Sequence, residues 1–192
     1  MKRLALLILV FFSSLSIAQA PTRVRGTIAT LDGDILSVKS RDGKDVKIHL
    51  TSDAQVATTK KATMADFKPG SYVGVTSVKG PNGRLVAKRV HALGPQVPAG
   101  HMAWDSIPDS LMTNATMESS AQVSGGNELT LKYKDGAQKI LVTPETEFFT
   151  FVPGSRADLK PGETIFTGAR GEGGKLVTQR ISVSKDGVNP PQ

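Results

Sequence analysis

The chain has 192 residues, with 24 Lys and Arg against 17 Asp and Glu, 39% hydrophobic residues, 19 Gly, 11 Pro and no Cys. This length is enough for one ordinary domain or two small ones, and the apolar fraction is compatible with packed cores. The lack of Cys excludes disulfide scaffolds, thiolate metal sites, iron–sulfur clusters and cysteine nucleophiles.

Residues 1–18 have the features of a cleaved signal peptide. Two basic residues precede an apolar run over residues 4–12, and small residues follow that run. The run is too short to span about 30 Å of hydrocarbon with a stable margin. Cleavage after Ala18 is preferred to cleavage after Ala20, because the latter would place Pro21 at the new N-terminus. We therefore expect a periplasmic or secreted protein with no membrane span in the mature chain.

An internal repeat follows the export signal. Residues 65–70 match residues 157–162, and residues 83–90 match residues 174–181, so the chain resembles itself at an offset of about 92 residues. Self-similarity at a fixed offset indicates a duplicated structural unit. The sequence therefore predicts two copies of one domain.

The copies occupy residues 23–92 and 114–186, with a linker over residues 93–113 and a flexible tail over residues 187–192. The linker is rich in Pro and Gly, which disfavour regular structure. It nevertheless contains the only Trp, and a bare tether would have no need of so large an apolar side chain. We expect Trp104 to be buried against one or both domains.

Each copy is predicted to be rich in β-structure. Apolar and polar residues alternate over 46–51, which is typical of a half-buried strand. Five strands are expected in the first copy, with a short additional strand at 54–58 as an alternative; the five lie near residues 23–31, 35–40, 45–51, 72–79 and 84–92.

One helical turn is expected at the same place in both copies, over residues 63–66 and 155–158. A hydroxyl residue followed three positions later by Asp resembles a capping box, and Lys-Pro-Gly then ends the turn. Three strands, a short helix and two strands is the order of an OB-type barrel, with an SH3-like barrel as the alternative. The predicted fold class is all-β: two tandem OB-like barrels, each with one short helix.

The charge is distributed unevenly along the sequence. Residues 23–92 hold 13 basic and 6 acidic residues, whereas residues 114–186 hold nine of each. A solubilising surface is the preferred interpretation of this charge, and an anionic envelope component bound by the first copy is the alternative. Nucleic acid is not expected, because the first copy offers few aromatic residues on which bases could stack.

Candidate metal ligands are limited to His101 and Met102 in the linker. Imidazole and thioether groups suit copper. Phosphate-binding loops, zinc-protease helices and nucleophile elbows are missing from the sequence. No catalytic residue and no cofactor is assigned. The expected function is a non-enzymatic binding or envelope-interaction module; the alternatives are a soluble metal-handling accessory of a transporter and a hydrolase with a site between the barrels.

Several segments resemble the exported bacterial domain of unknown function 5666. They are the opening Val24–Ile28, the Asp-Phe/Leu-Lys-Pro-Gly turns and the strand over residues 83–90, continuing through 101–105 and 112–116 to 185–191. The resemblance covers essentially the whole mature chain. Two-copy relatives are sometimes labelled metal ABC transporter permeases, but a permease needs several spanning helices, and the sequence after the signal peptide offers none. The resemblance implies no catalytic residues.

Overall fold

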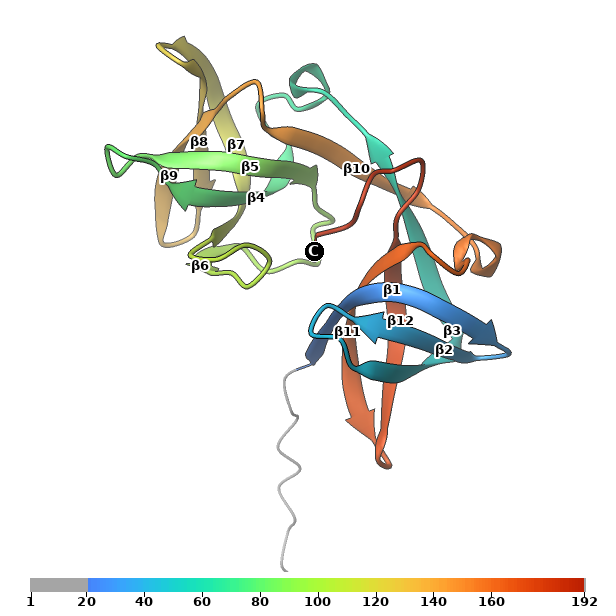
Figure 1. Ribbon diagram of the computed structural model, residues 1–192. Helices are drawn as coiled ribbons and strands as arrows, with labels where there is room; N and C mark the ends of the chain where they lie inside the picture. The colour runs from blue at the N-terminus through green and yellow to red at the C-terminus, as the bar shows by residue number, and fades with distance from the viewer. Residues whose placement is uncertain (1–20, 192) are drawn as a thin grey trace, which may run out of the picture.

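The computed structural model describes residues 21–191 and is almost entirely β-structure (Figure 1). The prediction of an all-β fold is confirmed. The predicted signal peptide, residues 1–18, lies outside the described residues. The strands are β1 (Thr22–Asp32), β2 (Ile35–Ser40), β3 (Asp45–Lys61), β4 (Tyr72–Lys79), β5 (Leu85–Ala92), β6 (Gly100–Ala103), β7 (Leu111–Val123), β8 (Gly126–Tyr133), β9 (Gly136–Val142), β10 (Glu147–Pro153), β11 (Thr164–Glu172) and β12 (Lys175–Val183).

Two single turns of 3-10 helix, η1 (Met64–Asp66) and η2 (Arg156–Asp158), lie where the sequence predicted helical turns. In both, the Asp side chain accepts a hydrogen bond from the backbone N–H three residues earlier, at 2.7 Å in η1 and 2.8 Å in η2. The chain then leaves through Gly70 and Gly162, whose φ angles of +93° and +91° favour glycine. The capping pattern and the Lys-Pro-Gly stop were therefore reliable guides to local structure.

The first barrel consists of β1, β2, β3, β11 and β12. Neighbours are antiparallel around the barrel, except that β12 runs parallel to β3 and closes it. Its core includes Ile28, Leu36, Ile48, Ile165 and Ile181, all fully or almost fully buried. The circular order, with η2 entering between the third and fourth strands, is that of an OB-type barrel.

The second barrel consists of β7, β8, β9, β4 and β5. It repeats the same order, and the parallel pairing of β5 with β9 closes it. Its core includes Val73, Val90, Met117, Leu131 and Ile140. The short strand β6 pairs with the beginning of β7 on the outside of this barrel.

Neither barrel is formed by one copy of the repeat, which corrects the predicted domains 23–92 and 114–186. Each barrel takes its first three strands from one copy and its last two from the other. Along the chain, residues 62–142 form the second barrel, which is inserted between the third and fourth strands of the first barrel. This exchange of strands between the copies buries the same apolar side chains as the predicted arrangement would, because the two copies have equivalent strands.

The long strand β3 explains the exchange. It includes both the strand predicted at 45–51 and the alternative strand at 54–58, and it carries the chain out of the first barrel. β10 brings the chain back, antiparallel to the end of β3, from Phe149 opposite Lys61 to Pro153 opposite Ala57. This two-stranded crossover ribbon joins the two barrels (Figure 1).

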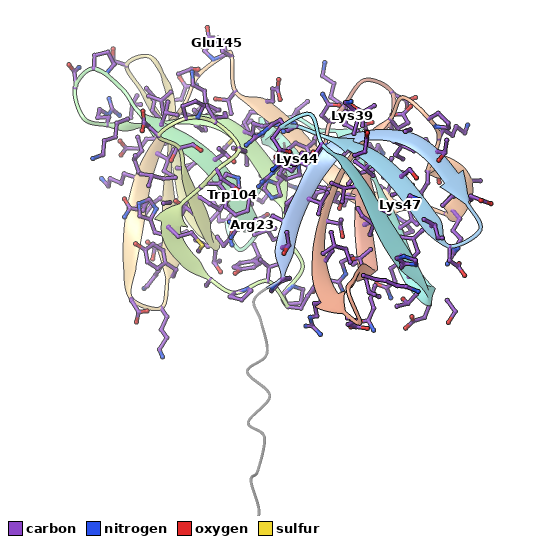
Figure 2. All side chains as sticks on the ribbon, turned by 60° about the horizontal axis from the view of Figure 1, so that its bottom comes forward. Arg23, Lys39, Lys44, Lys47, Trp104 and Glu145 are labelled. Atoms are coloured by element: carbon purple, nitrogen blue, oxygen red, sulfur yellow. The ribbon has the colours of Figure 1, made fainter. Side chains whose placement is uncertain are left out.

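The exchange also redistributes charge. The segments that form the first barrel, 22–61 and 156–183, contain 13 basic and 8 acidic residues, whereas 62–92 and 114–155 contain 8 basic and 6 acidic residues. The basic character expected for the first copy is therefore shared between the barrels. Lys39 at the end of β2 lies 3.7 Å from Asp45, and Lys44 in the following turn lies 2.8 Å from Asp42. Acids therefore partly neutralise the face on which Figure 2 labels these lysines.

The tail is ordered in the described residues, contrary to the prediction of a flexible segment over 187–192. Lys185 and Val188 form a β-bridge, and both Pro190 and Pro191 are buried. The described part of the tail lies between the two barrels (Figure 1). Within residues 21–191, no helix has the length and apolar character needed to cross a membrane.

Candidate functional site: the cleft between the barrels

A cleft of about 860 Å³ lies between the barrels, alongside the crossover ribbon. It is the strongest candidate site because both barrels, the linker and the tail contribute to its walls. The described lining residues include two arginines and no Asp or Glu. They comprise residues 54–57 of β3, 150–153 of β10, His91–Gly94, Gln96, Val97, Trp104, Met112, Asn114, Gly154, Ser155, Arg156, Phe166, Arg180, Ser182 and Pro191.

The two barrels supply rings to the cleft from equivalent cross-strand pairs of the repeat. In the second barrel, His91 of β5 lies opposite Gly74 of β4; in the first barrel, Ser182 of β12 lies opposite Phe166 of β11. Each cross-strand pair thus combines one ring with one small residue, in reversed order. A Cβ atom on Gly74 would lie 2.6 Å from the His91 ring, so the glycine is needed for the histidine to fit.

His91 is buried within an aromatic cluster. Its ring stacks on Phe149 at a centroid distance of 5.0 Å and meets the edge of Phe151 at 5.9 Å. Burial, with a smaller contribution from the charge of Arg89, lowers the pKa of His91 to about 3. The imidazole is therefore neutral near pH 7 and serves as a polar ring in an apolar wall.

Trp104 forms the linker side of the cleft. It is half-buried rather than largely buried, and its ring lies 6.4 Å from Phe166 of the first barrel. The guanidinium of Arg23 lies 4.4 Å from the indole centroid, and that of Arg25 lies 5.2 Å from it. Figure 2 shows Arg23 and Trp104 side by side between the barrels. The expectation that Trp104 packs against a barrel is met by these contacts.

Arg25 fixes the linker next to Trp104. Its guanidinium is almost fully buried and donates two hydrogen bonds to the carboxylate of Asp105, at 2.9 and 2.8 Å. Burial alone would raise the pKa of Asp105, but the hydrogen bonds and charge of Arg25 outweigh it and hold the pKa below its usual value. Arg41 donates to the backbone carbonyls of Asp105 and Ser106. The linker is thus tied to β1 and the β2–β3 turn.

Two arginines, one from each barrel, hold the tail. Arg89 of β5 donates to the carbonyl oxygens of Asn189 at 2.6 Å and Pro190 at 3.0 Å. Arg25 of β1 donates through Nε to the carbonyl oxygen of Pro191 at 3.2 Å. Thr59 of the crossover ribbon donates to the carbonyl oxygen of Val188.

A second cavity, of about 760 Å³, lies beside the earlier part of the tail. Val188 and Asn189 line this cavity, whereas Pro191 lines the cleft. Arg89, which lines the second cavity, also forms an ion pair with Glu147 at 3.0 Å. The tail therefore runs from one cavity to the other along the interface of the barrels.

Several polar groups of the cleft have no partner within residues 21–191. Trp104 Nε1 and His91 Nδ1 are buried and make no hydrogen bond there. The exposed Arg180 forms no ion pair with the described residues, unlike Arg156, which is paired with Asp34. Unpaired polar groups in a cleft can be satisfied by a bound molecule.

The two predicted metal-ligand candidates do not line the cleft. His101 lies on β6, its Nδ1 is 2.8 Å from Thr113 Oγ1, and its ring stacks on Tyr133 at 6.4 Å. Burial lowers the pKa of His101. Met102 is exposed and pairs with Met112 across the two strands. The part of the chain that the structure describes has no group of three His, Asp or Glu side chains able to hold a metal ion.

The sequence analysis missed Arg25, Arg89, Phe151, Phe166 and the tail as parts of the site. They come from segments far apart in the chain, and only the strand exchange brings them together. Arg25 is buried together with its chain neighbours Val24 and Gly26, which the sequence alone did not indicate. Comparisons with family models, curated proteins and solved structures gave no match.

Proposed function

We propose that the protein is an exported, non-enzymatic binding module, periplasmic or secreted, whose ligand occupies the cleft between the barrels. The observation that carries this proposal is a cleft of about 860 Å³ with rings from both barrels and the linker. Cavities of this size, mostly apolar with a few convergent polar groups, are typical of ligand sites. The two arginines and the lack of lining carboxylates favour a neutral or anionic ligand.

The chemistry of the cleft favours binding over hydrolysis. A general acid or base needs a pKa close to the working pH. The described lining contains one imidazole, that of His91, and burial lowers its pKa to about 3. His91 therefore cannot exchange a proton efficiently near neutral pH. The rival metal-handling role would use His101 and nearby Met, but Nδ1 of His101 is already engaged by Thr113 Oγ1 at 2.8 Å.

A substitution that fills the cleft tests the proposal. Ser182→Phe places a large side chain in the cleft, whereas Ser37→Phe places the same side chain on the outside of β2. Native mass spectrometry of protein purified from its own compartment should detect a bound molecule in the unmodified protein and in Ser37→Phe. The Ser182→Phe variant should lose it. Equal occupancy in all three proteins, or no bound molecule in the unmodified protein, would contradict the proposal.

Export can be tested separately. We expect the mature protein to begin at Gln19, which follows the preferred cleavage site. The intact mass of the protein recovered from the periplasm or medium reports this directly. A recovered protein that retains residues 1–18 would contradict cleavage and release.

A further inference from the structure

The tail occupies the interface of the barrels in the manner of a bound peptide. Its backbone carbonyls at three consecutive residues, Asn189 to Pro191, accept hydrogen bonds from two arginines on different barrels. Two consecutive prolines fix φ near −65°, close to the value of a polyproline II chain. The contacts are therefore made to an extended backbone with little freedom left to lose.

Arg25 and Arg89 form the seat of the tail, and other contacts hold them in place independently of it. The side chains of Arg25 and Arg89 are only 5% and 13% exposed. Arg25 is held by Asp105 and lies 4.9 Å from the Phe166 ring, and Arg89 lies 4.8 Å from the Phe149 ring. Both guanidinium groups are thus oriented by neighbours other than the tail, so they would remain in place for another peptide.

We propose that the Arg25–Arg89 seat and the adjoining cleft form a docking groove for an extended, proline-containing segment of a partner protein. The tail occupies this groove when no partner is present. The inference rests on the proposed binding function and names its ligand class. Aromatic-lined grooves are the usual docking sites of proline-rich segments, because the chain is already extended and loses little entropy. The rings of Trp104 and Phe166 line the cleft beside Pro191.

The flanking cavities support a peptide longer than the tail. Tail residues line both the 760 Å³ cavity and the 860 Å³ cleft, so a partner segment can extend into each. The arginines contact backbone carbonyl groups and therefore recognise the backbone conformation. Thr164 Oγ1 also donates to Asn189 Oδ1 at 2.8 Å, but this hydrogen bond is exposed, so its loss should cost little. A partner needs prolines at the positions of Pro190 and Pro191, while the residues corresponding to Val188 and Asn189 can differ.

The tail competes with any partner because it is tethered beside the groove. A short tether gives an effective concentration in the millimolar range. The test therefore uses a chain that ends at Asp186, with a synthetic peptide of residues 187–192 as the probe. Binding is followed by calorimetry and by the fluorescence of Trp104, the only Trp in the sequence. The shortened chain should bind the peptide at least about tenfold more tightly than the full chain does.

Two altered peptides test whether the groove binds proline-containing segments in general or only the protein's own tail. Replacement of both prolines by Ala should weaken binding at least about tenfold, because the extended conformation is lost. Replacement of Val188 and Asn189 by Ala should leave affinity within about tenfold. Equal binding of the proline-free peptide, or rejection of the Val188/Asn189-substituted peptide, would overturn the proposal.

A full-length variant provides a second test if the shortened chain does not fold. Pro190→Gly combined with Pro191→Gly keeps every residue position but weakens the tethered competitor. This variant should bind the unmodified peptide more tightly than the parent protein does. Should neither the shortened chain nor this variant bind the peptide, the peptide groove is refuted. A cleft ligand detected by native mass spectrometry and lost in Ser182→Phe would still leave the proposed binding function standing.

Discussion

Arg25 is the residue on which most parts of the interface depend. It contacts the linker through Asp105, the tail through Pro191, and the rings of Trp104 and Phe166. Bidentate pairs between Arg and a carboxylate are among the stronger hydrogen-bonded contacts in proteins. Because Asp105 is about half exposed, its side chain at 52%, the desolvation cost of the pair falls mainly on Arg25.

Arg25→Ala should therefore lower the free energy of unfolding by about 1–3 kcal/mol, since it leaves Asp105 and the tail carbonyl without their donor. Urea denaturation measures this change. Arg23→Ala is the matched control: Arg23 is exposed and lies 3.8 Å from the same carboxylate, so its loss should cost less than about 1 kcal/mol. Equal effects of the two substitutions would show that the buried contacts of Arg25 contribute little.

His91 should make stability depend on pH in the mildly acidic range. Its pKa is about 3 in the folded protein and about 6.5 when unfolded, so only the unfolded state binds a proton between these values. The contribution of His91 to the free energy of unfolding is therefore fully present above about pH 6.5. It falls by about 1.4 kcal/mol per pH unit as the pH drops towards 3. We expect a loss of about 2–3 kcal/mol between pH 7 and pH 4.5 from this residue.

Urea denaturation of His91→Gln across that range provides the measurement, and the variant should show a much flatter pH profile. His101→Gln is the control, because burial also lowers the pKa of the less buried His101 and gives a smaller slope of the same sign. Aspartates with lowered pKa, such as Asp105, lose their contribution at lower pH, below about 4. An unchanged slope in His91→Gln would mean that His91 is hydrated or charged in the folded protein.

At the scale of elements, the linker is a structural part of the interface rather than a tether. Its strand β6 pairs with β7 of the second barrel, while Trp104 contacts Phe166 of the first barrel. Trp104→Ala should lower the free energy of unfolding by about 1–2 kcal/mol, less than for a fully buried Trp, because the ring is only half-buried. Thermal melting of Trp104→Ala and Trp104→Phe measures the difference. The Phe variant keeps a ring and should therefore lose less stability.

The emission of Trp104 checks the same contact in the unmodified protein. A half-buried indole should emit at shorter wavelength than free indole and be quenched only partly by iodide. Full quenching with an emission maximum equal to that of a model peptide would show that the linker does not pack. The two readouts are independent, since one reports stability and the other exposure.

Local elements could be predicted from the sequence because their signals are local. Alternation over residues 46–51 predicted a strand and which of its side chains face the core. The pair Thr63 and Asp66 predicted the helical turn. The path of the chain after residue 51 could not be predicted in this way. Either a turn back into the first barrel or a continuous β3 would bury the same apolar residues, because both copies offer equivalent strands.

The candidate site was hidden for the same reason. Phe166, Ser182 and His91 line the same cleft, and no short sequence motif joins them. The tail looked free because it consists of Pro, Gly and polar residues. Its order comes from donors such as Arg89, about one hundred residues away in the chain. Sequence spacing carries no information about such a contact.

At the scale of the whole molecule, the strand exchange can be distinguished by experiment from an arrangement with one barrel per copy. Each barrel is closed by two pairings that connect the two copies: β1 with β11 and β3 with β12 in the first barrel, and β4 with β7 and β5 with β9 in the second. A protease site inserted between the exposed Pro98 and Ala99 allows the chain to be cut within the linker after folding.

The cut protein should remain a single particle in size-exclusion chromatography, with both fragments eluting together at the size of the intact chain. The fragments should separate only in denaturant, because the interstrand hydrogen bonds and both cores are shared between them. Two barrels arranged one after the other would instead be released as particles of about half the mass, since a cut linker would leave each of them complete. Separation under native conditions would therefore contradict the strand exchange, and with it a cleft built from both copies.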